Sequence, residues 1–316
     1  MPTSYTVPKL SIREIISKLN SVDYIASPDI AYAASGTINE RIPLLIEGQP
    51  GQGKTQLAKA VAKMLGLELI RVQMYDGITP DKIMYDYDYQ RQLLTIEAIR
   101  STLDGSLNGK TPEEAIQLAS GIDFYGKQFL IRRPILRALT SDKPVVLLLD
   151  EVDKTSEELE YALLEVLDEF SMTIPQYGTI RCKPENRPLV FLTSNNYREL
   201  SDAMKRRCNY LYISEKTQDE IREIIKKQTN LSANVADGVA ACLAELQKAS
   251  LRQKPSIAEG IAWANYVTQS TDVTGDTLKD TAFLLAKDQH DTGRVQVIIQ
   301  KHKEILNDKK PWGNKE

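Results

Sequence analysis

The segment from Gly48 to Thr55 constrains this chain more than any other, because its spacing of glycine, lysine and threonine suits few local structures. It reads Gly-Gln-Pro-Gly-Gln-Gly-Lys-Thr. Glycines carry no Cβ, so the backbone N–H groups of such a loop can wrap closely around a phosphate. Lys54 would place a positive charge against the β- and γ-phosphates, and the Thr55 hydroxyl is a ligand for Mg²⁺. The segment therefore predicts a loop that binds a nucleoside triphosphate.

The sequence on both sides of the loop supports this interpretation. Residues 43–47 are a short apolar run that suits a buried parallel strand. Leu57, Val61, Met64 and Leu65 then recur at the spacing of one helix face. A helix that begins at the loop points its positive dipole end at the phosphate. A glycine-rich surface turn is the alternative, but it would not require strand, loop and helix in this order.

A second motif lies about a hundred residues downstream, where the apolar run 145–149 ends in Asp150 and Glu151. The first acid at such a strand end typically belongs to the Mg²⁺ shell, and the second can act as a general base towards water. We therefore expect Thr55 and Asp150 to hold Mg²⁺ and Glu151 to be catalytic. A solvated acidic turn would be an equal alternative without the loop. The predicted ATP-binding residues are Gly48, Gln49, Pro50, Gly51, Gln52, Gly53, Lys54, Thr55, Gln56 and Asp150.

Composition excludes several other classes of protein. The formal net charge of the 316 residues is −3, which gives no sign of a nucleic-acid-binding surface. No segment approaches the roughly 18 apolar residues of a membrane span, and the N-terminus does not look like a signal peptide. Cys182, Cys208 and Cys242 are widely spaced, as in a protein of a reducing compartment. We therefore expect a cytoplasmic protein.

The order of apolar patterns predicts an α/β fold in which helices cover both faces of a parallel sheet. A helical lead-in occupies 1–41, where Ile12, Ile15, Ile16 and Leu19 recur at helical spacing. Helical patterns separate most of the strand-like runs that follow. These runs are 43–47, 67–72, 145–149, 188–193 and 209–213.

We expect three further features around this core. Thr155 and Glu158 form a T-x-x-E capping box at the start of a helix. Two alternating runs around a Pro/Gly turn predict a hairpin within 171–182. Residues 73–128 are irregular, and we interpret them as an insertion with a helix at 112–119.

The insertion contains Tyr85-Asp86-Tyr87-Asp88-Tyr89, where strand alternation would put three rings on one face. A half-buried edge strand and a pore element that grips a client chain are the two interpretations. Arg132 and Arg133 could face a subunit interface or the nucleotide, or form a solvated basic cluster.

Strand patterns stop after about residue 215, and only helical ones follow. We therefore expect a nucleotide-binding domain over 1–215 and an all-helical lid domain over 216–316. The expected helices of the lid are 217–228, 233–249, 256–269, 276–288 and 293–304.

Together these motifs resemble the AAA+ ATPases, and among them the MoxR family, over about residues 24–264. The phosphate loop and the Asp150-Glu151 pair support this resemblance, as do the segments 191–196 and 200–208. The combination is most similar to the branch of accessory ATPases for metalloenzyme maturation, such as the carbon monoxide dehydrogenase accessory proteins.

The resemblance implies further catalytic roles. Asn195 matches the sensor 1 residue, whose amide can contact both the γ-phosphate and the attacking water. Arg207 matches the arginine finger that completes the site of a neighbouring subunit, with Arg206 as the adjacent alternative. A turn asparagine and a solvated basic helix end are the simpler interpretations of these residues. One position departs from the family, because the late lid helix lacks its usual arginine and Lys254 is the nearest cation.

The resemblance also implies partners and cofactors. They are ATP and Mg²⁺, further copies of the chain in a ring that is expected to be a hexamer, a von Willebrand factor A partner protein, and a protein client to be remodelled. An ATP-dependent nucleic-acid assembly factor is the alternative function, and the net charge of −3 argues against a nucleic-acid partner. A scaffold that binds ATP without hydrolysing it is a further alternative, but the Asp150-Glu151 pair argues against it.

Overall fold

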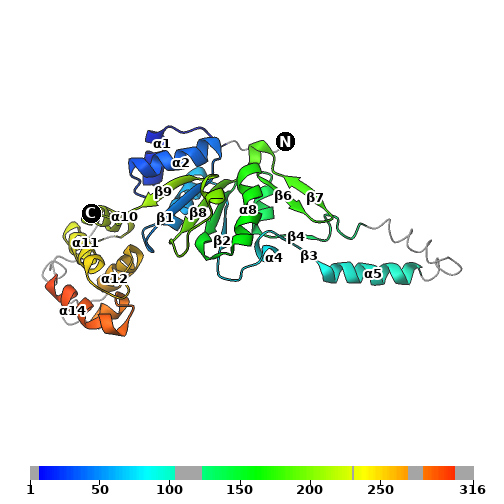
Figure 1. Cartoon of the computed structure of the whole chain (residues 1–316). Helices are drawn as coiled ribbons and strands as arrows, with labels where there is room; N and C mark the ends of the chain where they lie inside the picture. The colour runs from blue at the N-terminus through cyan, green and yellow to red at the C-terminus, as the bar shows by residue number, and fades with distance from the viewer. Residues whose placement is uncertain (1–6, 104–122, 230, 270–279, 303–316) are drawn as a thin grey trace.

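The structure is a computed structural model that describes residues 7–103, 123–229, 231–269 and 280–302. One parallel sheet of five strands forms its centre, in the order β2-β5-β8-β1-β9 (Figure 1). The strands are β1 (Leu44–Gly48), β2 (Leu69–Gln73), β5 (Val146–Asp150), β8 (Leu189–Ser194) and β9 (Asn209–Ile213). These are the five predicted runs, and the first four begin one or two residues later than expected. The predicted α/β fold is confirmed.

Helices cover both faces of this sheet, as the continuous apolar runs require. On one face lie α1 (Ile12–Ser21), α2 (Pro28–Glu40) and α3 (Lys54–Leu65). On the other lie α7 (Pro134–Leu139) and α8 (Glu157–Glu169). Each face of the sheet has its own apolar core. Leu44 and Ile46 of β1 pack into one core, and Leu45 packs into the other. The helical lead-in is also confirmed, since α1 buries Ile15 and Leu19.

The predicted capping box of α8 is wrong by one residue. Ser156 is the N-cap, and its side chain accepts the N–H of Leu159. The Thr155 hydroxyl instead donates to the carbonyl oxygen of Val152 at 2.8 Å. The cause is a 3₁₀ turn, η1 (Val152–Lys154), which engages Thr155 before the helix can begin. After α8 the expected hairpin is present as β6 (Ser171–Ile174) and β7 (Gly178–Arg181).

The segment that we interpreted as an insertion contains α4 (Pro80–Ile83), β3 (Tyr85–Tyr87) and α5 (Tyr89–Leu103). The expected helix at 112–119 lies outside the described residues, and α5 was not predicted. The strand expected to carry three tyrosines is also wrong. β3 ends at Tyr87, where it pairs with β4 (Leu130–Arg132), and Tyr89 already belongs to α5. Helix α5 projects away from the sheet (Figure 1).

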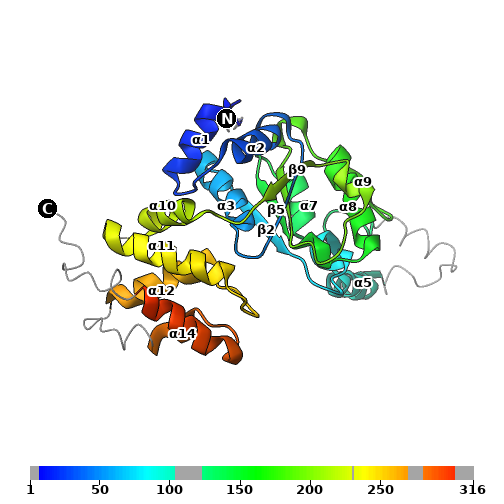
Figure 2. The same cartoon turned by 60° about the vertical axis from the view of Figure 1, so that its left-hand side comes forward.

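The C-terminal region is helical, as expected. It contains α10 (Gln218–Gln228), α11 (Ala233–Lys248), α12 (Ile257–Gln269) and α14 (Thr292–Lys301), which share a separate apolar core (Figure 2). The helix expected over 276–288 is not continuous in its described part. There the chain forms the 3₁₀ turn η3 (Thr281–Leu284), which is followed by another, η4 (Gln289–Asp291). The domain boundary near residue 215 stays a prediction.

Every helix among the described residues is too short or too polar to span a membrane.

Candidate nucleotide-binding site

The loop 49–53 joins the end of β1 to the start of α3 and has the backbone shape that its glycines permit. Gly51 and Gly53 have φ angles of 82° and 89°, in the left-handed region that favours glycine. Because Gly53 is the residue before α3, the helix presents its N-terminal N–H groups to the loop. The expected strand, loop and helix are therefore present in the predicted order. This is the geometry of an anion-binding helix N-terminus.

Lys54 is buried, and its ammonium group is fully engaged. Its Nζ donates to the carbonyl oxygens of Gly48 at 2.6 Å and Gln49 at 2.9 Å, and to Oδ1 of Asn195 at 2.8 Å. Burial lowers the pKa of Lys54, and the carboxylates of Asp153, Asp150 and Glu151 oppose this shift. The ammonium group is thus held at the loop by two backbone carbonyl oxygens and one side-chain amide oxygen.

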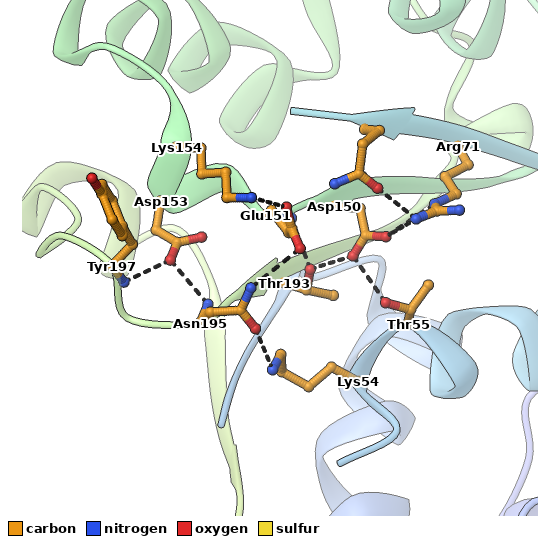
Figure 3. Close-up of polar contacts among 11 residues, drawn as sticks. Lys54, Thr55, Arg71, Asp150, Glu151, Asp153, Lys154, Thr193, Asn195 and Tyr197 are labelled. Carbon is orange, nitrogen blue, oxygen red and sulfur yellow. Dashed lines mark hydrogen bonds and ion pairs between the residues drawn. The ribbon is translucent and has the colours of Figure 1, made fainter. Parts of the chain in front are cut away.

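Asp150 ends β5 and lies beside the phosphate loop, as the sequence predicts (Figure 3). Its Oδ1 accepts the hydroxyl of Thr55 at 3.0 Å and that of Thr193 at 2.5 Å. Its Oδ2 accepts both Nε and Nη2 of Arg71, at 2.9 Å and 2.6 Å. The side chain is almost completely buried, so these contacts replace the water that a carboxylate would otherwise bind.

Glu151 adopts a left-handed backbone conformation, with φ of 61°, which is uncommon for a residue other than glycine. Its N–H donates to the Thr193 hydroxyl at 2.9 Å. Its carboxylate receives the Asn195 amide at 3.3 Å and the Lys154 ammonium at 2.6 Å. The hydrogen bond to Glu151 also raises the pKa of Lys154. The strained backbone turns this carboxylate away from the strand towards Asn195.

Asn195 connects the two motifs, because its side chain contacts both Lys54 and Glu151. Asp153 holds its backbone by accepting the N–H groups of Asn195 at 3.0 Å and Tyr197 at 2.7 Å (Figure 3). The structure thus brings together residues predicted from separate motifs.

Four residues of this site were not predicted: Arg71, Asp153, Lys154 and Thr193. Two of them had a local signal. Asp153 completes an Asp-Glu-x-Asp spacing, and Thr193 precedes Asn195 by two positions, which places both on one side of an extended chain. Arg71 had no such signal, because only the order of the strands brings β2 beside Asp150.

The cavities beside the phosphate loop are lined partly by loop residues and partly by residues of other elements. A cavity of about 220 Å³ is lined by Lys54, Thr55, Gln56, Asp150, Glu151 and Asn195, together with Pro50, Gly51, Gly53, Thr193 and Ala258. A second, of about 170 Å³, lies between Gln52 and Gln56 of the loop region, Tyr24 of the lead-in, and Ile257 of α12. Buried Gln52 has no hydrogen-bond partner for its Oε1. The first cavity therefore contains the predicted phosphate and Mg²⁺ ligands, and the second extends from the loop towards the lead-in and α12.

The C-terminal helical region contacts the loop directly. A Cβ placed on Gly51 would lie 2.6 Å from the Cβ of Ser256, the residue before α12. Ala258 rather than Lys254 lines the first cavity. Lys254 points instead towards Glu215, with 4.0 Å between Nζ and Oε1. Lys254 lines a separate cavity of about 640 Å³ together with Gln49 to Gln52 of the loop, so its role as a substitute for the absent arginine stays a prediction.

Arg207 does not line the first cavity of its own chain. Its Nε lies 3.2 Å from Oδ2 of Asp168, and its Nη1 donates to the carbonyl oxygen of Ala203 at 3.0 Å. Arg206 beside it is exposed. Arg132 is exposed too, whereas Arg133 pairs with Asp86 of the insertion at 2.9 Å, and neither arginine lines the first cavity.

The donor set fits a Mg²⁺ ion that is held jointly with a nucleotide. Thr55 and Asp150 offer two oxygen ligands at the wall of the cavity. Among the described residues no group of three or more His, Cys, Asp and Glu side chains is arranged to hold a metal. Mg²⁺ commonly takes one or two protein oxygens and completes its shell with water and substrate phosphates. The residues present therefore suit that shared coordination.

Comparison with known families decides the wider assignment. The AAA domain family (dynein-related subfamily) matches residues 43–208, just over half of the chain. The chain belongs to this family. It is therefore an AAA+ ATPase, and the matched region runs from β1 to the segment that carries Arg207.

More distant similarity extends to individual proteins. The chain is 29% identical to the Lon protease of Rhizobium meliloti over 65% of its own length and 21% of the protease. It is 26% identical to Lon protease 1 of Bacillus subtilis over 65% of its own length and 22% of that protease. The chain thus spans about a fifth of the length of these relatives. Among solved structures, a RuvB mutant from Thermotoga maritima aligns with 95% of this chain and 73% of its own, at a TM-score of 0.45 and 16% identity.

Proposed function

We propose that the chain is an ATPase of the MoxR type, which hydrolyses ATP with Mg²⁺ and uses the reaction to remodel or activate a protein client. One observation carries the proposal. A single cavity is lined by Lys54, Thr55, Asp150, Glu151 and Asn195, so the groups that phosphoryl transfer requires converge in one place.

Each of these side chains has a role that follows from its position. Lys54 and the loop N–H groups bind the β- and γ-phosphates, and Thr55 and Asp150 bind Mg²⁺. Bound Mg²⁺ neutralises charge on the phosphate oxygens. Glu151 accepts a proton from the attacking water, and Asn195 orients that water because its amide already lies 3.3 Å from Glu151. The predicted contacts of the remaining loop residues, Gly48 to Gly53, and of Gln56 belong to the same proposal.

The proposed active assembly is a ring, with six subunits as the expected number. Its support is the place of Arg207, which lies outside the first cavity of its own chain and so suits the site of a neighbour. The fixed charge and planar donors of an arginine stabilise a transferring phosphoryl group. The contact between Ser256 and Gly51 gives the nucleotide a route to the helical region, which we propose acts as a lid domain from about residue 216.

The narrower assignment rests on sequence resemblance. We propose the branch that matures metalloenzymes, with a von Willebrand factor A protein as partner between ring and client. The cytoplasm is the proposed compartment, because Cys182, Cys208 and Cys242 are all free thiols.

The variant Glu151→Gln tests the core of the proposal. Removing the base should lower phosphate release by about a hundredfold or more while ATP affinity stays within a few-fold of wild type. Phosphate release and binding of a fluorescent ATP analogue are measured on the same preparation. Glu157→Gln is the matched control, because Glu157 is an exposed glutamate in the first turn of α8.

Other results would change the assignment. Wild-type turnover in Glu151→Gln would remove this residue from the mechanism. ATP binding by wild type without phosphate release would favour a nucleotide-gated scaffold. Salt-sensitive stimulation of the ATPase by DNA would favour the nucleic-acid assembly factor.

A further inference from the structure

The contact between Arg71 and Asp150 is the feature of the site that its proposed chemistry does not use. Arg71 lies in β2, and its guanidinium approaches Oδ2 of Asp150 with both Nε at 2.9 Å and Nη2 at 2.6 Å. Nη2 also donates to Oε1 of Gln73 at 2.5 Å. The Arg71 side chain keeps 44% of its surface exposed, whereas Asp150 keeps 4%. The arginine therefore reaches from solvent to a buried acid (Figure 3).

Strand order explains how this contact arises. β2 pairs with β5 in parallel, and Gln73 lies opposite Asp150 in the register. Alternation along β2 buries Ile70 and Val72 in the core and sends Arg71 and Gln73 to the other side. That side is the one on which Thr55 of α3 also contacts Asp150. The arginine and the proposed Mg²⁺ ligands thus meet at the same carboxylate.

Asp150 and Glu151 each have a cation as partner in the absence of a ligand. Lys154 pairs with Glu151, and Lys54 is held by carbonyl and amide oxygens. Among the described residues, Arg71 is the cation in ion-pair contact with Asp150. Its removal would leave a buried carboxylate with only the two threonine hydroxyls as partners. An uncompensated buried charge is unfavourable, so this contact favours the nucleotide-free state.

We propose that Arg71 is a positioning residue that competes with Mg²⁺ for Asp150. In the nucleotide-free chain it neutralises Oδ2, and it moves out to solvent when the metal arrives with a nucleotide. The Mg²⁺ ion would join Thr55 and Asp150, so it and the guanidinium would depend on the same buried carboxylate, and two cations held so close together repel each other. Arg71 thereby sets the Mg²⁺ concentration at which nucleotide binds tightly. The inference rests on the proposed binding of a Mg²⁺–nucleotide pair at this site.

The test measures binding of a fluorescent ADP analogue to the full chain as Mg²⁺ is titrated, so that no turnover is involved. Arg71→Ala should lower the half-saturating Mg²⁺ concentration by about tenfold, the strength of one charged hydrogen bond. Arg71→Lys retains the charge without the two-donor contact and should fall between Arg71→Ala and wild type. Thermal unfolding adds an independent readout. Without ligand the melting temperature of Arg71→Ala should be below that of wild type. Addition of Mg²⁺ and ADP should raise the melting temperature of the variant by more than it raises that of wild type.

Arg137→Ala is the matched control. Arg137 forms an ion pair of 2.6 Å with Glu68, just before β2, and both side chains are about half exposed. The Arg137→Ala substitution should leave the Mg²⁺ dependence of ADP binding unchanged. A half-saturating Mg²⁺ concentration in Arg71→Ala that equals or exceeds the wild-type value would overturn the inference. Failure of the wild-type chain to bind ADP at any Mg²⁺ concentration would instead overturn the proposed function, so the two failures are distinguishable.

Discussion

Asp153 and Asn195 are joined by a hydrogen bond of 3.0 Å between a buried carboxylate and a backbone N–H. The same oxygen of Asp153 accepts the N–H of Tyr197 at 2.7 Å, so one side chain fixes the turn that follows β8. The Asn195 amide then reaches Lys54 on one side and Glu151 on the other. Asp153 therefore positions a residue that links the phosphate loop to the proposed base.

Replacing Asp153 with alanine should damage both stability and turnover. Two backbone N–H groups would lose their charged acceptor, and a hydrogen bond to a charged group contributes about 1.5–3 kcal/mol. We expect the free energy of unfolding to fall by about 2–4 kcal/mol in urea titrations. Phosphate release should fall by more than tenfold, because Asn195 is no longer oriented.

Asp142→Ala is the control, since Asp142 is exposed. Asp153→Asn preserves side-chain volume and one acceptor oxygen. Because one oxygen of Asp153 accepts both N–H groups, Asp153→Asn should retain most of the stability and turnover, whereas normal phosphate release from a folded Asp153→Ala variant would contradict the positioning role.

Gly51→Ala should separate the loop from the helical region. A Cβ at this position would lie 2.6 Å from Ser256 Cβ, and the φ of 82° is unfavourable for alanine. The backbone strain alone costs about 1–2 kcal/mol. The variant should therefore be less stable by this amount. It should also bind nucleotide more weakly, because the start of α12 must move away from the loop. Calorimetric titration with ADP and Mg²⁺ measures the affinity.

The chain offers a matched control in Gly66→Ala. Gly66 follows α3 with φ of 64°, but no atom lies within 4 Å of its added Cβ. This variant carries the backbone strain without the clash with Ser256, so its stability should fall while its nucleotide affinity stays unchanged. Equal affinities in the two variants would show that the contact does not influence the site.

The sequence predicted those parts of the fold that depend on local pattern. Each run of apolar residues became a strand of the sheet, because a strand buried on both faces must be apolar throughout. The glycines of the loop and the Asp150-Glu151 pair were recognisable for a similar reason, since each motif lies within a few consecutive residues.

What the sequence left out depends on neighbours in space. Arg71 reaches Asp150 only because β2 lies next to β5, and Thr193 bridges Asp150 and Glu151 only because β8 lies on the other side. A residue pattern does not reveal the order of parallel strands. The capping error at Thr155 has a local cause, because the 3₁₀ turn after Glu151 competes with the helix for the same residue.

The thiol of Cys242 should make the chain less stable in alkali. Burial raises its pKa from 9.0 to about 12, so the folded state keeps the thiol neutral where the unfolded state ionises it. The neutral Cys242 thiol makes its full contribution to folding stability below pH 9, and this contribution is lost as the pH rises towards 12. At pH 10 the loss is on the order of 1 kcal/mol, because the thiol ionises in the unfolded state only.

Cys242→Ala isolates this contribution when urea unfolding is compared at pH 7 and pH 10. At pH 7 the thiol is neutral in both states, so that measurement gives the packing cost of the substitution alone. The decrease in unfolding free energy between the two pH values should be smaller in the variant than in wild type by on the order of 1 kcal/mol. An identical decrease in both proteins would show that Cys242 does not ionise on unfolding in this range.

Arg207→Ala should abolish turnover without abolishing nucleotide binding. Loss of an arginine finger lowers phosphoryl transfer by about a thousandfold or more. ATP affinity should change little, because Arg207 contacts Asp168 and Ala203 in its own chain and does not line the first cavity. Arg206→Ala tests the adjacent alternative, and we expect near-normal phosphate release from it.

Mixing two inactive variants decides whether Arg207 acts between subunits. Lys54→Ala subunits have no working phosphate loop but retain Arg207, whereas Arg207→Ala subunits retain the loop. In a mixed ring the site of an Arg207→Ala subunit can receive the arginine of a Lys54→Ala neighbour and become complete. Phosphate release from the mixture should therefore exceed that of either variant alone. If the mixture stays inactive although the subunits co-assemble, Arg207 acts only within its own chain, where its ion pair with Asp168 would give it a structural role.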